Sequence, residues 1–152
     1  MIRAIVSGEK RGAQRGAQIA VEDFNARIGY QSVGFIRIEN EGNEHFEKVI
    51  DTGHGVVIFA HLSALGVAYI IRIADARRKP HRVFDHNRGD CPYELATWCS
   101  ENKIEKLSVL GFKEEICPGI EQKVFRSVVD LIGLSQITSE MQRRNENGSR
   151  KR

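Results

Sequence analysis

Short apolar runs, rich in β-branched residues, alternate along the chain with longer stretches that carry apolar residues at helical spacing. Each short run is apolar on both faces and no tight hairpin turn joins one run to the next, which indicates buried parallel strands. We therefore expect strands at residues 2–6, 33–36, 56–59, 82–84 and 107–110. The longer stretches predict helices at residues 13–27, 43–51, 63–78, 92–102 and 119–132.

This fivefold alternation of strand and helix predicts an α/β fold. The expected architecture is a doubly wound, mostly parallel five-stranded sheet with helices on both faces. We expect one such domain over residues 1–134, with Gly133 ending its last helix. Residues 135–152 are polar and charged, and we interpret them as a basic, disordered tail.

The net positive charge of the chain is concentrated at its end. Among 152 residues, Lys and Arg number 23 and Asp and Glu number 20, a net charge of +3. Residues 143–152 hold five basic residues and one acidic residue, a net of +4, so the remainder carries −1. We therefore expect no nucleic-acid-binding domain, and at most a weak contact between nucleic acid and the basic tail.

Cysteine use and hydropathy exclude further classes of protein. The three cysteines form no Cys-x-x-Cys pair, so we expect neither a disulfide framework nor a zinc ribbon. The sequence has no signal-peptide-like apolar core and no apolar stretch of bilayer length. These features predict a cytoplasmic protein that does not enter a membrane.

Ligands of open parallel sheets bind at the carboxyl ends of the strands, in the crevice where the strand order reverses. The loops that follow the first, third and fifth expected strands span residues 7–12, 60–66 and 111–119. Each loop contains glycine and leads into an expected helix. These loops are therefore where we place a candidate ligand site.

The first loop carries the most information. It reads Ser7-Gly8-Glu9-Lys10-Arg11-Gly12, and Arg15 follows in the first turn of the expected helix. The glycines allow close approach of a ligand to the backbone, and the helix directs its positive end at that ligand. The three cations lie where the helix dipole disfavours positive charge, and a bound phosphate or other anion would explain them. The alternative is a set of solvated cations beside an ordinary turn.

The other two loops offer weaker candidates. His61 is placed to contact a ligand, and Ser63 either does so or, as we prefer, caps the next helix. The long fifth loop is typical of a functional connection, although Pro118 and Gly119 also suit an ordinary helix start. We assign no catalytic residue. We also assign no metal site, because the spacing of the residues in the His- and Asp-rich stretch matches no recognised metal motif. These residues are His81, Asp85, His86, Asp90 and Cys91.

Motifs in all three loops resemble one known family. The first is Ile5-Val6-Ser7-Gly8 followed by Gly12-Ala13, Arg15 and Ala17; the second is Val57-Ile58-Phe59 with Ser63-Ala64-Leu65; the third is Leu107-Ser108-Val109-Leu110-Gly111 with Cys117-Pro118-Gly119-Ile120. In register and order, these motifs resemble the molybdenum-cofactor carrier family over residues 2–132. That resemblance implies a Rossmann-like fold related to the SLOG nucleotide-ligand binders and the lonely-guy phosphoribohydrolases. It also implies a molybdenum cofactor or a nucleotide as ligand, and self-association.

The sequence also departs from this family. Glu9, Lys10, Arg11 and Gln14 replace the family's second Gly, Gln, Thr and Asp, and His61-Leu62 replaces a Gly-Gly pair. Glycines in this loop would let a ligand approach the backbone closely, whereas here the charged side chains of Lys10 and Arg11 would attract the ligand instead. Either the ligand differs from the family's or binding has been lost. The Pro-Gly-Gly-x-Gly-Thr-x-x-Glu run of the phosphoribohydrolases is absent, so their chemistry is not expected.

Three functional hypotheses follow. The preferred one is non-catalytic binding of a phosphorylated nucleotide-type or molybdenum-cofactor-like ligand by a homo-oligomer, so an enzyme is the less favoured class. The second is a nucleotide-processing hydrolase or transferase that uses Glu9 and His61. The third is a degenerate structural subunit with a vestigial pocket. The expected ligand-binding residues are Ser7, Gly8, Glu9, Lys10, Arg11, Gly12, Arg15, His61, Ser63, Gly111, Pro118 and Gly119.

Overall fold

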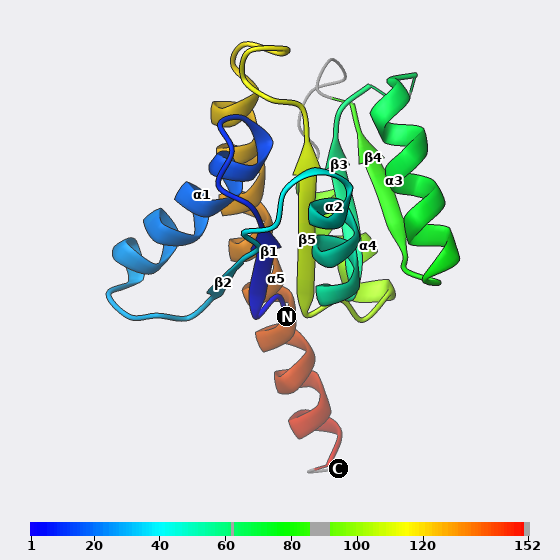
Figure 1. Cartoon of the computed structure of the whole chain (residues 1–152). Coiled ribbons are helices and arrows are strands. Elements are labelled where there is room, and N and C mark those ends of the chain that lie inside the picture. Colours follow the sequence, from blue (N-terminus) through cyan, green and yellow to red (C-terminus); the bar gives the residue numbers. More distant parts are fainter. Residues whose placement is uncertain (62, 86–91, 151–152) are drawn as a thin grey trace.

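Five short strands form one parallel sheet in the order β2-β1-β5-β3-β4 (Figure 1). The computed structural model describes residues 1–61, 63–85 and 92–150. Every expected strand is present within a residue or two of its predicted position, because runs that are apolar on both faces are stable only when helices cover both faces. The strands are β1 Ala4–Ser7, β2 Gly34–Arg37, β3 Gly55–Phe59, β4 His81–Phe84 and β5 Lys106–Gly111.

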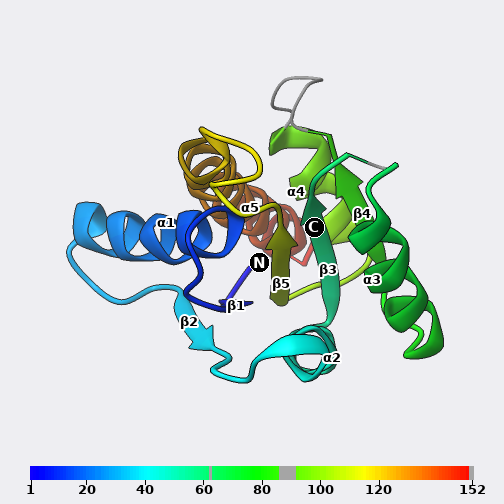
Figure 2. The ribbon, with the colours of Figure 1, turned by 45° about the horizontal axis from the view of Figure 1, so that its top comes forward.

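Helices cover both faces of the sheet, as Figure 2 shows. One face packs against α1 (Ala13–Ile28), α4 (Pro92–Glu101) and α5 (Ile120–Ser149). The opposite face packs against α2 (Gly42–Thr52) and α3 (Leu65–Ala76). The doubly wound α/β fold predicted from the sequence is therefore confirmed, and all strand pairs are parallel.

The inner strand β3 shows how the sequence divides the core between the two faces. Val57 and Phe59 belong to the cluster under α1, α4 and α5, whereas Val56 and Ile58 belong to the cluster under α2 and α3. All four side chains are almost completely buried. Alternation along a strand sends successive side chains to opposite faces, so two separate apolar layers form on one sheet.

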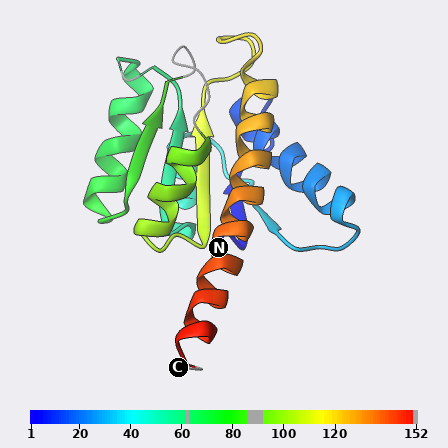
Figure 3. The same cartoon turned by 180° about the vertical axis from the view of Figure 1, so that it is seen from behind.

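The end of the chain differs from the prediction. Helix α5 continues to Ser149 and projects beyond the sheet (Figure 3), so the interpretation of residues 135–149 as disordered is wrong, and Gly133 does not end the helix. Contacts beyond Gly133 explain the continuation. The buried Ser135 hydroxyl accepts the Ile2 N–H at 2.8 Å, and the Gln136 amide donates to Ser32 Oγ at 2.6 Å. Within the described residues, no helix has the length and apolarity needed to cross a membrane.

Candidate ligand-binding site

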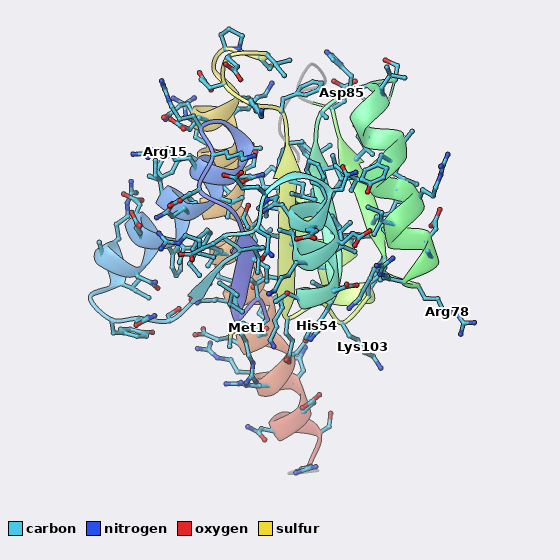
Figure 4. The ribbon with its side chains drawn as sticks, viewed as in Figure 1. Met1, Arg15, His54, Arg78, Asp85 and Lys103 are labelled. Atoms are coloured by element: carbon cyan, nitrogen blue, oxygen red, sulfur yellow. The ribbon has the colours of Figure 1, made fainter. Side chains whose placement is uncertain are left out.

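The loops after β1 and β5 meet at the carboxyl edge of the sheet. The chain leaves β1 toward β2 on one side and leaves β3 toward β4 on the other, with β5 between them. This reversal places the loops of all three central strands at the ligand-binding edge of the fold. Figure 4 shows Arg15 and Asp85 at that edge, and Met1, His54 and Lys103 at the opposite one.

Backbone pairing joins the first loop to the β5–α5 connection. Gly12 and Lys113 form an isolated antiparallel bridge, Ala13 N–H donates to Phe112 O at 3.0 Å, and Glu114 N–H donates to Arg11 O at 3.2 Å. Gly12 has a φ of 114°, and a Cβ there would lie 2.5 Å from Phe112 O, so only glycine fits. This pairing brings the cations of the two loops together.

The paired loops border a cavity of about 390 Å³ that is open to solvent. It is lined by Lys10, Arg11, Lys113, Glu114 and Glu115. Its three cations outnumber its two carboxylates. The Glu114 carboxylate is held by the backbone: it accepts the Gly119 N–H at 2.6 Å and the Glu121 N–H at 2.9 Å. These two hydrogen bonds, the one from Glu121 first, lower the pKa of Glu114, and the Arg11 charge adds to that effect.

No ion pair engages the lysine and arginine side chains of the cavity in the part of the chain that the structure describes. Lys10, Arg11 and Lys113 are exposed and extend from two different loops. Like charges held near one another repel, so the arrangement is stabilised when an anion enters between them. The cavity can therefore bind a small anion through charged side-chain donors.

The first turn of α1 already has an anionic partner from the same chain. Gly12 is the N-cap residue of α1 and provides no side-chain cap, but its N–H donates to Glu121 Oε1 at 3.2 Å. The same carboxylate lies 3.9 Å from Arg15 Nε. Glu121 can reach this position because Gly16 lets α1 pack directly against the backbone of α5 at that residue. Arg15, one of the three cations that suggested a bound anion, therefore has a carboxylate of the same chain beside it.

The remaining predicted residues of the first loop serve structural contacts. The Ser7 hydroxyl is buried and donates to Val109 O at 2.6 Å. The Glu9 carboxylate is exposed and pairs with Arg37 Nη1 at 3.1 Å. Gly8 is buried, and its Cα faces two polar side chains, those of Gln14 and His45.

The predicted residues of the other loops lie outside the cavity lining. His61 Nδ1 lies 3.4 Å from Asp85 Oδ1, and its ring packs edge-on against Phe112. Ser63 is exposed, and the prediction that it caps α3 is wrong because the N-cap residue is Ala64. In the β5–α5 connection, Gly111 packs against Phe59, Pro118 is exposed, and Gly119 is the N-cap residue of α5.

Several residues of the site were not singled out from the sequence. Lys113 lies in a loop that was identified, but its pairing with the first loop depends on the position of β5 beside β1. Glu121 reaches Gly12 across 109 positions of the chain, a contact that one sequence does not reveal. His86, Asp90 and Cys91 of the His- and Asp-rich stretch lie outside the described residues. Elsewhere in the described structure, no group of three His, Cys, Asp or Glu side chains is arranged to hold a metal ion.

Comparison with known proteins supports the fold. No family model matches the chain, and no curated protein sequence matches it. Among solved structures, the crystal structure of the "Putative molybdenum carrier protein" from Syntrophus aciditrophicus matches with a TM-score of 0.62 and 22% identity. The match covers 88% of this chain and 94% of that one. The chain is thus a Rossmann-like α/β protein. This likeness confirms the resemblance noted in the sequence at the level of the fold.

Proposed function

We propose that the protein binds a small phosphorylated ligand, of a nucleotide or molybdenum-cofactor type, without transforming it. The observation that carries this proposal is the convergence of Lys10, Arg11 and Lys113 on one cavity at the carboxyl edge of the sheet. Lysine and arginine side chains are the usual donors to phosphate, and they bind it most strongly as charge-assisted hydrogen bonds. The cavity volume of about 390 Å³ lies in the range of small-molecule sites.

The structural neighbour gives this proposal a second, weaker support. Its name describes a molybdenum carrier, and the two chains share their fold over most of their length. A carrier holds its ligand without changing it. The cavity agrees with this role, because its cations can attract an anion and the Glu114 carboxylate already accepts two backbone N–H groups. Self-association remains a prediction, and the subunit number is measured in the experiment below.

A matched pair of double variants tests the proposal. Lys10→Ala/Arg11→Ala removes two cations from the cavity, and Arg78→Ala/Lys103→Ala removes two exposed cations at the opposite edge (Figure 4). Native mass spectrometry of the freshly purified proteins reports subunit number and any bound small molecule. Isothermal titration calorimetry with nucleoside monophosphates and ribose 5-phosphate measures affinity.

The cavity variant should lose any co-purified ligand and bind phosphorylated probes at least about tenfold more weakly, a loss of about 1.4 kcal/mol that one charge-assisted contact can account for. The control variant should match the wild-type protein. Added salt should weaken binding to the wild-type protein, because the contacts are exposed charges. Equal affinity in the two double variants, or no binding by the wild-type protein, rejects the proposal.

One observation favours a second candidate function, hydrolysis of a bound nucleotide. Asp85 lies 3.4 Å from His61 Nδ1 at the ends of two adjacent strands, so a carboxylate orients an imidazole as it does in general-base catalysis. Glu9 pairs with Arg37, which leaves His61–Asp85 as the pair to test. Chromatography of the nucleotide after incubation with the protein should then show a product, and Asp85→Asn should abolish it while binding persists. An unchanged nucleotide rejects hydrolysis.

A further inference from the structure

Two buried side chains at the first loop carry polar atoms that make no hydrogen bond of ordinary geometry with the described residues. Gln14 is 7% exposed and His45 is 3% exposed. Gln14 Oε1, His45 Nδ1 and His45 Nε2 are shielded from solvent, and no donor or acceptor of the described protein meets them at hydrogen-bond geometry, although the Asn40 backbone lies near enough to the ring to raise the pKa of His45. Buried polar atoms are almost always hydrogen-bonded, since leaving them unpaired costs free energy. Both residues therefore point to a partner that is not part of the described chain.

The two side chains come from opposite faces of the sheet and meet at one point. Gln14 lies in the first turn of α1 and His45 near the start of α2, and these helices cover different faces. A Cβ built on Gly8 would collide with Gln14 Oε1 and would lie 2.7 Å from His45 Cε1. The meeting point is therefore directly beyond the carboxyl end of β1, where this fold class binds its ligands.

Contacts with the cavity connect this point to the proposed anion site. Lys10 is close enough to His45 for its positive charge to act on the ring. Glu9 follows Gly8, against which the two side chains lie; its side chain is 62% exposed and forms an ion pair with the 47% exposed Arg37 side chain. Such exposed pairs hold a loop only weakly. Lys10 O and Arg11 O accept the N–H groups of Arg15 and Glu114, so that end of the segment is fixed, whereas no such backbone bond holds Gly8 and Glu9 among the described residues. A ligand anchored on Lys10 therefore has to shift Gly8 and Glu9 alone to reach Gln14 and His45.

The chemistry of the two side chains defines what they can bind. Burial, and secondarily the Lys10 charge, lowers the pKa of His45 against the opposing effect of the Asn40 backbone, so the ring is neutral at physiological pH. A neutral imidazole offers one donor and one acceptor, and the glutamine amide offers a carbonyl acceptor and an NH2 donor. This combination matches a planar ring edge with adjacent N–H and carbonyl or ring-nitrogen groups. A phosphate presents acceptors only, so it would leave Gln14 Oε1 and the acceptor nitrogen of His45 unpaired.

We propose that Gln14 and His45 form a recognition subsite for the heteroaromatic ring of the ligand, whose phosphate is bound by Lys10, Arg11 and Lys113. This inference rests on the proposed function, because the phosphate contact brings the ring to the first loop. It adds a division of roles: the exposed cations supply attraction, and the buried pair supplies selectivity. A site built to hydrogen-bond a ring edge rejects a ligand that lacks it, since its polar groups then stay buried and unpaired.

The test compares ligands with and without the ring. Calorimetric titrations use adenosine, guanosine, cytidine and uridine 5′-monophosphates and ribose 5-phosphate. The variants are Gln14→Leu and His45→Phe. The matched controls are Gln18→Leu, one turn further along α1, and His54→Phe at the opposite edge of the sheet (Figure 4). Thermal unfolding of each variant verifies folding, and Gln14→Leu should unfold no earlier than the wild-type protein because it removes a buried atom without a partner.

In the wild-type protein we expect at least one nucleotide to bind about tenfold or more tightly than ribose 5-phosphate. Gln14→Leu and His45→Phe should bring that nucleotide to within about twofold of ribose 5-phosphate, whose own affinity stays unchanged. The controls should keep the full preference. A wild-type protein that binds all probes equally overturns the subsite and leaves the proposed function intact, whereas one that binds none of them overturns both. If both subsite variants keep the preference for the nucleotide over ribose 5-phosphate, the subsite is overturned. The buried polar atoms would then be hydrogen-bonded by ordered water and not by a ligand.

Discussion

Removing the Glu121 carboxylate tests whether this side chain caps the first turn of α1. It accepts the Gly12 N–H at 3.2 Å and lies 3.9 Å from Arg15 Nε. Because α1 has no side-chain cap of its own, Glu121→Ala leaves the Gly12 N–H without an acceptor at the positive end of the helix. Two opposite effects should follow: the protein loses stability, and the vacated helix end becomes available to an external anion.

The size of the stability loss follows from the two contacts. A hydrogen bond to a charged group contributes about 1.5–3 kcal/mol, and the length of this one favours the lower value. The Arg15 contact adds at most about 0.5 kcal/mol because the Arg15 side chain is 52% exposed and the pair is long. The expected loss is therefore about 2 kcal/mol, which for a chain of this size lowers Tm by about 4–8 °C.

Urea denaturation in a phosphate-free buffer measures this loss as a change in midpoint at constant m-value. Asp130→Ala is the matched control, because it removes an exposed carboxylate from the same helix. Addition of inorganic phosphate should then raise the stability of Glu121→Ala more than that of the wild-type protein, through mass action at the vacated helix end. A loss below about 0.5 kcal/mol, the range of ordinary surface substitutions, would refute the capping role. Equal stabilisation of both proteins by phosphate would refute the prediction that an external anion binds at the helix end that Glu121 vacates.

Two further predictions concern the same region. Gly12→Ala should destabilise the protein by about 3 kcal/mol or more, because its φ of 114° is strained for alanine and its Cβ would lie 2.5 Å from Phe112 O. Gly42→Ala, at a φ of 65° in open space, should cost only about 1 kcal/mol by the same urea measurement, and equal losses contradict this reasoning. His45 has a pKa below its ordinary value of 6.5, so the unfolded chain binds a proton that the native protein does not, and stability should fall as pH drops below about 6.5. His45→Phe should show a smaller fall between pH 7.5 and 5.5, and an identical fall in both proteins contradicts the assignment.

The strands and most helix positions could be predicted because local patterns determine them. A run such as 56–59 is apolar on both faces, and its place in a covered sheet follows directly. The strand order could not be predicted, since pairing of β5 between β1 and β3 depends on contacts across the whole chain. The contributions of Lys113 and Glu121 to the site depend on that order, and both residues were therefore missed.

The end of α5 shows a different limit of sequence reasoning. Residues 135–149 lack an apolar stripe, and their polarity was interpreted as disorder. Helix formation is costly to begin and cheap to extend, and the preceding turns are packed against α1 and α4. The extension is therefore a consequence of the packed half of the helix. Gly133 continues the helix because the next turns are anchored by Ser135 and Gln136.

The departure of the first loop from the family motif has a physical counterpart in the structure. Where the family has a second glycine, this chain has Glu9, and the N–H groups at the start of α1 are taken by Phe112 O and by Glu121. On the proposed function, we therefore expect the exposed side chains of Lys10 and Arg11, and not a cradle of backbone amides, to bind a phosphate at this edge. Such contacts are sensitive to salt and distinguish poorly between anions. Selectivity then has to come from buried groups with fixed geometry, and at this end of the sheet Gln14 and His45 are groups of that kind.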